Sequence, residues 1–68
     1  MNDHVYRKTA LVGSSAKSID DAISTALARA SKTVRNIEWF EVDEIRGSVK
    51  DGKVQNYQVS LNAGFRVE

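Results

Sequence analysis

The segment Val49-Lys50-Asp51-Gly52-Lys53-Val54 decides how this chain folds. Asp-Gly between two β-rich runs is among the strongest signals for a two-residue β-hairpin, because both central residues must adopt positive φ. We therefore expect one strand from just after Asn36 to about Lys50, and a return strand from Lys53 to about Val67. In this register Lys50 pairs with Lys53, and Gln58 lies opposite Ile45.

Two further elements are expected before the hairpin. Residues 4–12 (HVYRKTALV) form a β-rich run, and the Gly13-Ser14-Ser15 that follows is a turn signal. Ser18 is typical of a helix N-cap, with Asp21 three positions later in a near capping box. Apolar residues then recur at spacings of three and four, which predicts an amphipathic helix of about four to five turns. These residues are Ile19, Ala22, Ile23, Ala26, Leu27, Ala30 and Val34.

The order of these elements predicts an α+β fold of the β-α-β-β type, a single domain over residues 1–68. A strand joined to the next by a helical crossover should lie parallel to it, so the last strand should pair between the other two. The expected sheet has the order 1-3-2, with the helix on one face. Strict alternation places Phe40, Val42 and the odd residues 57–67 on the helix side. The outer face should then carry Ile37, Trp39, Glu41, Asp43 and Ile45 with Asn56, Gln58, Ser60, Asn62, Gly64 and Arg66.

The composition limits what the protein can be. A domain near 68 residues buries only about 60% of the surface of its unfolded chain. Disulfides and thiolate metal sites are excluded because the chain has no cysteine, and it has one histidine. Oligomerisation is therefore the expected stabiliser. Ten basic and nine acidic residues are interspersed and give a net charge of +1, which argues against nucleic acid. No membrane segment or signal peptide is visible, so we expect a cytoplasmic protein.

Trp39 is the first candidate site residue, because alternation puts this lone tryptophan on the polar outer face. Burying roughly 150–250 Å² at about 25 cal/mol/Å² stabilises by on the order of 4–6 kcal/mol. We expect a second subunit, a flat ligand, or both to cover it. Trp39 is then either an interface anchor or a stacking platform for a planar aromatic ligand.

Three polar residues are further candidates. Gln58 is either a solvated strand residue or a reader of a heterocycle's donor–acceptor edge. It should lie roughly 20 Å from Trp39 within one chain, so one flat ligand would meet the two only across subunits. Arg46 and Arg66 either bind phosphate or carboxylate groups or form surface ion pairs. Alternation places Arg46 on the helix side unless a bulge turns it. With one histidine, no cysteine and no nucleophile–base constellation, an enzyme is not expected.

Several stretches together resemble the dodecins, a family of small flavin-binding proteins that assemble into hollow dodecamers. They are Val5-Tyr6-Arg7-Lys8, residues 11–15 (LVGSS), residues 39–42 (WFEV), Asp51-Gly52 and the ending Gly64-Phe65-Arg66 that follows Val59. The resemblance covers essentially the whole chain, and the WFEV run and the Gly-Phe-Arg ending are its most specific parts.

The resemblance implies a function and assigns roles. Trp39 matches the tryptophan that stacks on the isoalloxazine ring, and Gln58 matches the glutamine that hydrogen-bonds the ring's polar edge. Arg46 and Arg66 match arginines of bacterial members, some of which also bind coenzyme A. The implied protein is a homododecamer that stores FMN, or else riboflavin or FAD, as pairs between tryptophans, and quenches their photochemistry. The alternative is a coenzyme A-binding or purely structural assembly module in which Trp39 only packs between subunits.

Overall fold

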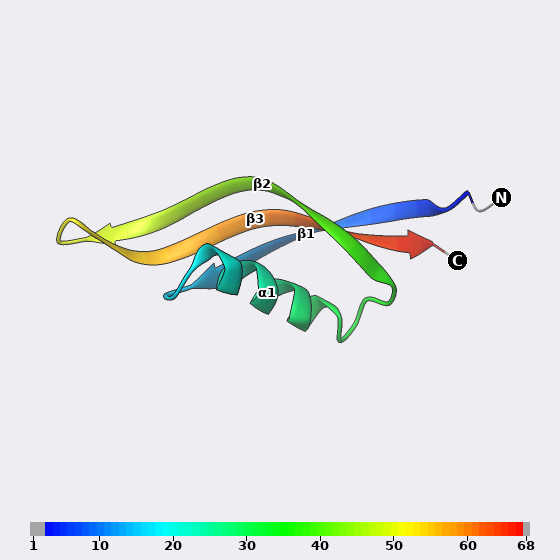
Figure 1. The fold of residues 1–68 in the computed structure, drawn as a ribbon, viewed down its shortest axis with the longest axis horizontal. Coiled ribbons are helices and arrows are strands. Elements are labelled where there is room, and N and C mark those ends of the chain that lie inside the picture. The colour runs from blue at the N-terminus through cyan, green and yellow to red at the C-terminus, as the bar shows by residue number, and fades with distance from the viewer. Residues whose placement is uncertain (1–2, 68) are drawn as a thin grey trace.

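A computed structural model describes residues 3–67, and in these residues the expected β-α-β-β fold is confirmed (Figure 1). Residues 1, 2 and 68 of the expected domain lie outside the described part. The three strands form one antiparallel sheet in the order β1-β3-β2. The elements are β1 (Val5–Ser15), α1 (Ile19–Ala30), β2 (Ile37–Lys50) and β3 (Lys53–Val67).

The helix begins where the sequence predicts and ends earlier. Ser18 is extended, and its hydroxyl accepts a hydrogen bond from the Asp21 backbone N–H, as expected of an N-cap. The predicted four to five turns through Val34 are wrong, because α1 stops at Ala30. The Ala30 carbonyl accepts from the backbone N–H groups of both Thr33 and Val34 in a tight turn. Asn36, at a φ of 64°, then turns the chain into β2.

The first strand is longer than predicted, since Gly13, Ser14 and Ser15 continue β1 instead of forming a turn. Ser15 is buried, and its hydroxyl connects the end of β1 to the start of α1 through hydrogen bonds. The hydroxyl donates to Asp21 Oδ2 at 2.7 Å and accepts from the Lys17 backbone N–H at 2.9 Å and from that of Ser18 at 3.3 Å. Strand end and helix start are thereby joined without a separate turn.

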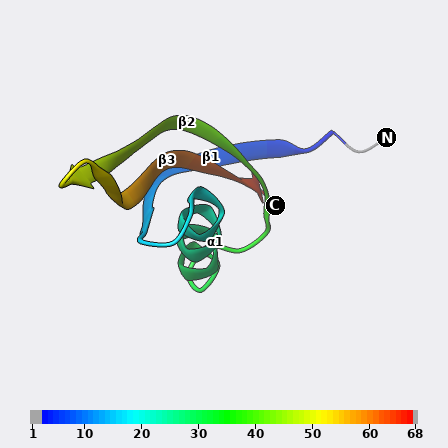
Figure 2. The same cartoon turned by 60° about the vertical axis from the view of Figure 1, so that its left-hand side comes forward.

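The core is small and lies where the sheet curves over α1 (Figure 2). Its buried residues are Ala22, Val59, Leu61 and Ala63, with Leu11, Ile19, Ile23, Ala26 and Leu27 packed partly against them. Only β1 and β3 have substantial contact with the helix. The resulting shape is elongated, 54 × 21 × 15 Å, with a Cα radius of gyration of 14.1 Å. A compact domain of this length has a radius of about 11 Å.

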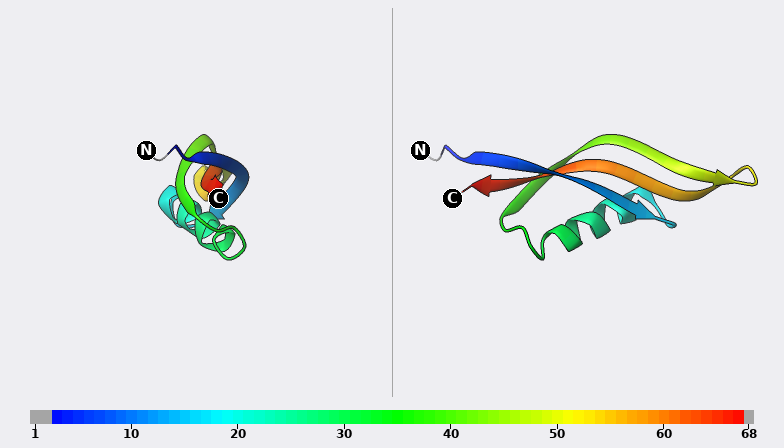
Figure 3. Two further views of the ribbon diagram at one scale, coloured as in Figure 1. Left: turned by 90° about the vertical axis from the view of Figure 1, so that its right-hand side faces the viewer. Right: turned by 180° about the vertical axis from the view of Figure 1, so that it is seen from behind.

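The β2–β3 hairpin extends well past the helix as a bare arm (Figures 1 and 3). Its turn is the predicted one, with φ of 53° at Asp51 and 75° at Gly52. Every β2 residue except Ile37 is exposed. The exposed side chains include the apolar Phe40, Val42, Ile45 and Val49. Among the described residues, no helix is long and apolar enough to span a membrane.

Three irregularities shift the hairpin register away from strict alternation. One extra residue is inserted at Glu38, at Asp43 and, on β3, at Gln55. The expected pairing of Gln58 with Ile45 is therefore wrong: Gln58 lies opposite Arg46, and Ile45 lies opposite Val59.

The same shifts correct the expected faces of three residues. Directly opposed side chains share a face. Ile45, opposite the core residue Val59, and Ile37, opposite Phe65, therefore lie on the helix side and not on the outer face. Arg46 is turned to the outer face, which is the outcome that the sequence made conditional on a bulge.

Candidate functional site

Trp39 lies on the outer face, as predicted, and the chain itself covers much of it. The indole rests on Gly64, its cross-strand partner, so closely that a Cβ on Gly64 would overlap the indole ring. Tyr6 packs beside it, with ring centroids 5.8 Å apart and planes tilted by 59°. About a third of the Trp39 surface (36%) remains exposed. Glycine is needed at position 64 because only a bare backbone lets an aromatic ring lie flat on the strand.

A polar cluster of Tyr6, Glu38 and Arg66 lies beside Trp39. Tyr6 Oη donates to Glu38 Oε1 at 3.0 Å, and Arg66 Nη1 lies 3.5 Å from Glu38 Oε2. The hydrogen bond to Glu38 raises the pKa of the Tyr6 phenol, since the carboxylate favours the protonated donor. Glu38 is a bulge residue, so the same irregularity that interrupts β2 places its carboxylate between Tyr6 and Arg66. Arg66 is therefore near Trp39, as part of a framework around the indole.

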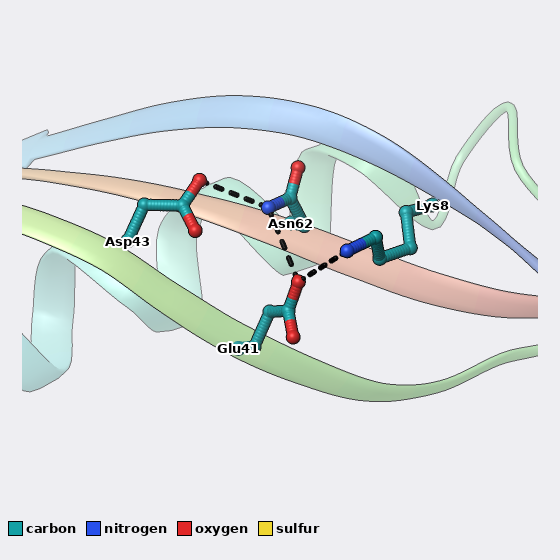
Figure 4. Close-up of polar contacts among 4 residues, drawn as sticks. All are labelled: Lys8, Glu41, Asp43 and Asn62. Atoms are coloured by element: carbon teal, nitrogen blue, oxygen red, sulfur yellow. Dashed lines mark hydrogen bonds and ion pairs between the residues drawn. The ribbon is translucent and has the colours of Figure 1, made fainter.

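Next along the outer face, a polar network joins all three strands (Figure 4). Lys8 Nζ lies 2.7 Å from Glu41 Oε2. Asn62 Nδ2 donates to Asp43 Oδ2 at 2.9 Å and more weakly to Glu41 Oε2 at 3.4 Å. The hydrogen bond and charge of each partner lower the pKa of Glu41 and raise that of Lys8. All four side chains lie on the side of the sheet away from α1.

Gln58 and Arg46 form a second cluster towards the hairpin. Arg46 Nη1 donates to Gln58 Oε1 at 2.9 Å, and Nη2 donates to Ser60 Oγ at 3.1 Å and pairs with Glu44 Oε1. The two residues border a hollow of about 190 Å³ that is lined by Arg46, Gly47, Ser48, Asn56 and Gln58. Here sequence reasoning placed each residue as a candidate and missed that they bind each other.

The structure thus separates the four predicted site residues into two pairs. Arg66 accompanies Trp39 at one end, and Arg46 accompanies Gln58 at the other. Gln58 is six positions along β3 from Gly64, on which Trp39 lies, so the two ends are roughly 20 Å apart. Sequence reasoning missed Tyr6 and Lys8 as parts of this face; it placed Asn62 there without its partners Glu41 and Asp43. The alternation of Tyr6 and Lys8 on β1 was the available signal, but it needed the β1–β3 register, which no turn defines.

The outer face of the described residues offers no metal centre, because no group of three His, Asp or Glu side chains is placed to hold an ion. What it does offer is an exposed aromatic platform at one end and a hydrogen-bonding amide at the other, on a βαββ sheet with a bare arm. This arrangement defines a small α+β sheet protein whose outer face is largely polar and carries one partly exposed tryptophan.

Comparisons with known proteins agree on one family. The family model described as Dodecin matches residues 5–68. A dodecin from Thermus thermophilus is 53% identical over 64 residues, which cover 94% of this chain and 93% of that protein. The structure superimposes on dodecins from Streptomyces coelicolor (47% identity, TM-score 0.90, 100% of this chain and 97% of that one) and Streptomyces davaonensis (43%, 0.89, 98% of each). The chain belongs to the dodecin family.

Proposed function

We propose that this protein is a non-enzymatic flavin store of the cytoplasm. It stacks FMN, or else riboflavin or FAD, in pairs between Trp39 side chains of neighbouring subunits in a homododecamer. The observation that carries the proposal is the Trp39 indole. It is seated on Gly64, supported by Tyr6 and still one third exposed on the outer face of the sheet. A planar ring fits such a platform, because offset stacking adds about 0.5–1.5 kcal/mol to the burial of apolar area.

Assembly is supported by the shape of the chain. The elongated molecule leaves β2 exposed, and Phe40, Val42 and Ile45 present apolar surface on the helix side that α1 leaves largely uncovered. A chain this small needs more burial than its own core supplies. Association would also bring Trp39 of one subunit near Gln58 of another, which the separation within one chain requires if both serve one ligand.

Work on a relative points to the same residues. Structures have been solved for variants of Thermus thermophilus dodecin in which a tryptophan was changed to phenylalanine or one of two arginines to alanine. The replaced residues are spaced by seven and then twenty positions in that chain. Trp39, Arg46 and Arg66 have the same spacing here.

The proposal is tested by adding FMN to flavin-free protein and following flavin fluorescence. Stacking against an electron-rich indole should quench the emission, with saturation near about one flavin per chain because each indole faces one ring. Trp39→Ala should weaken binding about 100-fold or more, since it removes most of the apolar contact. Trp39→Phe should fall between, and Tyr6→Phe, which keeps its ring, should bind like the parent. Unchanged emission with the parent protein would rule out the flavin function.

A second candidate, coenzyme A binding, is favoured by one other observation. A hollow of about 470 Å³ lies between the segment that follows α1, the start of β1 and the end of β3. It is lined by Arg7, Arg35 and Arg66 together with Thr33, Val34, Asn36, Phe65 and Val67. Guanidinium groups beside apolar side chains suit a phosphate-bearing ligand with an apolar body. Calorimetry with coenzyme A, on the parent and on Arg35→Met, separates this function from flavin storage. If both proteins ignore coenzyme A, the second candidate is wrong.

A further inference from the structure

The Gln58 side chain is held in one orientation by Arg46. A guanidinium group has only N–H donors, so the atom of the Gln58 amide that faces Arg46 Nη1 at 2.9 Å must be the carbonyl oxygen. The other end of the amide, Nε2 with its two N–H groups, then points away from Arg46. In the described residues Nε2 donates to no acceptor.

Arg46 is itself held in place by three partners. Its N–H groups are directed at Gln58, Ser60 and Glu44, and the Glu44 carboxylate offsets its charge. A phosphate that bound Arg46 through Nη2 would displace the bonds to Glu44 and Ser60. Arg46 therefore has fewer N–H groups available for an anion than an unpaired guanidinium has.

We infer that Arg46 is a positioning residue that fixes the Gln58 amide with its NH2 group towards the ligand, so that the group Gln58 reads is a carbonyl oxygen. The inference rests on the proposed flavin function and names the part of the ring that is recognised. An isoalloxazine presents two carbonyl groups on either side of one N–H along its polar edge. A ligand with a donor at that point would instead meet two N–H groups and leave them unsatisfied, which weakens binding.

The first test reverses the chemistry of Gln58 while keeping its size. Gln58→Glu keeps an oxygen for Arg46 and removes the NH2 group. At pH 7 it should therefore lose riboflavin affinity as much as Gln58→Ala does. Fluorescence titration with riboflavin measures both. If Gln58→Glu binds like the parent while Gln58→Ala does not, the carbonyl end of Gln58 reads the ligand and the inference is overturned.

The second test asks whether Arg46 acts through Gln58 or touches the ligand. Arg46→Met should weaken riboflavin and FMN equally, by about tenfold, and should cause no further loss in the Gln58→Ala background. Arg46→Lys should be intermediate, since one ammonium group cannot reproduce the fork that bonds Gln58 and Ser60. Arg29→Met, which removes an exposed helix arginine, is the matched control and should bind like the parent.

The outcomes separate the inference from the function on which it rests. If Arg46→Met weakens FMN much more than riboflavin, or if its loss adds to that of Gln58→Ala, Arg46 contacts the ligand directly and the inference is wrong. If the parent binds neither flavin, the proposed function itself fails. Circular dichroism and sedimentation check that each variant folds and assembles. If Arg46→Met does not fold, the comparison of Gln58→Glu with Gln58→Ala still decides which end of the amide reads the ligand.

Discussion

Leu61 and Val42 are directly opposed on neighbouring strands and point to the same side of the sheet, yet their surroundings differ completely. Leu61 on β3 is 1% exposed beneath α1, whereas Val42 on β2 is 39% exposed. The same alternation of apolar residues thus gives a closed core at β3, beneath the helix, and an open apolar surface on the neighbouring strand β2. The difference teaches that this chain completes only half of its core by itself and leaves the apolar residues of the other half exposed.

The largest expected effect comes from the covered half. Leu61→Ala should lower the free energy of unfolding by about 2–5 kcal/mol, because it leaves a cavity under the helix. Val42→Ala removes a smaller and partly solvated group and should cost about 1 kcal/mol or less in the isolated chain. Denaturant unfolding measures both, and sedimentation reports whether Val42→Ala instead weakens assembly. If both variants lost the same free energy of unfolding in a dissociated chain, Leu61 and Val42 would be equally well packed and the contrast between the two strands would be wrong.

Glycines in the two halves should also respond differently. A methyl group on Gly13 would overlap the Ala22 carbonyl and meet Ala26 Cβ at 3.0 Å, so Gly13→Ala should push α1 away from β1. The expected cost is about 1–3 kcal/mol or more. Gly52→Ala, in the hairpin turn, has open space and only its φ of 75° to oppose it. It should cost about 1–2 kcal/mol. Thermal unfolding ranks the two, and a larger loss at Gly52 would contradict the close helix packing.

The buried hydroxyl of Ser15 gives a smaller effect at the edge of the covered half. Ser15→Ala removes the acceptor for two backbone N–H groups and the donor to Asp21. It should therefore cost about 1–2 kcal/mol in urea unfolding. Ser14→Ala is the matched control, because Ser14 is the exposed neighbour of Ser15 in the sequence. This substitution should leave the stability nearly unchanged. If the two variants were equally stable, the Ser15 hydroxyl would not organise the junction.

The smallest effect is expected on the outer face, at the exposed Lys8–Glu41 pair. Lys8→Met should let the pKa of Glu41 rise towards its ordinary value of 4.5, because Lys8 is the main cause of the lowered pKa. The contribution of Glu41 to stability is present above pH 4.5 and is lost as the pH falls through the lowered pKa of the folded state. Lys8 contributes below its ordinary pKa of 10.5 and loses this as the pH rises through its raised pKa. Carboxyl NMR titration of the parent and variant measures the shift, and an unchanged Glu41 pKa would contradict the ion pair.

Much of this fold could be predicted from short-range chemistry. Asp51-Gly52 predicted the turn, Ser18 the start of the helix, and the crossover rule the strand order. These predictions succeeded because each depends on a few adjacent residues or on chain connectivity. The end of α1 was mispredicted because Val34 continues the apolar stripe but belongs to the turn that follows Ala30.

The bulges were the main failure, although the sequence carries a trace of them. Each lies between two apolar residues spaced by three instead of two: Ile37 and Phe40, Val42 and Ile45, Val54 and Tyr57. An inserted residue returns the second member of each pair to the helix side. The assumption of strict alternation cannot locate the bulges, whereas the spacing of three between apolar residues marks the position of each one.

For the candidate site, the residue types were predictable and their partnerships were not. The outer position of Trp39 followed from its neighbours on β2, and its separation from Gln58 followed from counting residues along β3. The seat on Gly64, the Tyr6 contact and the bond between Arg46 and Gln58 each join different strands. Such contacts depend on the register between strands, which a one-residue shift changes completely.

By itself, the sequence of this protein determined its elements, its family and the exposed tryptophan, because turn chemistry, periodicity and characteristic runs act over a few residues. Only the tertiary structure decided which way Arg46 points, which end of the Gln58 amide is free and which half of the sheet is covered. Those features arise where strands far apart in the chain meet in one register. Their energies belong to pairs of residues that no local pattern connects.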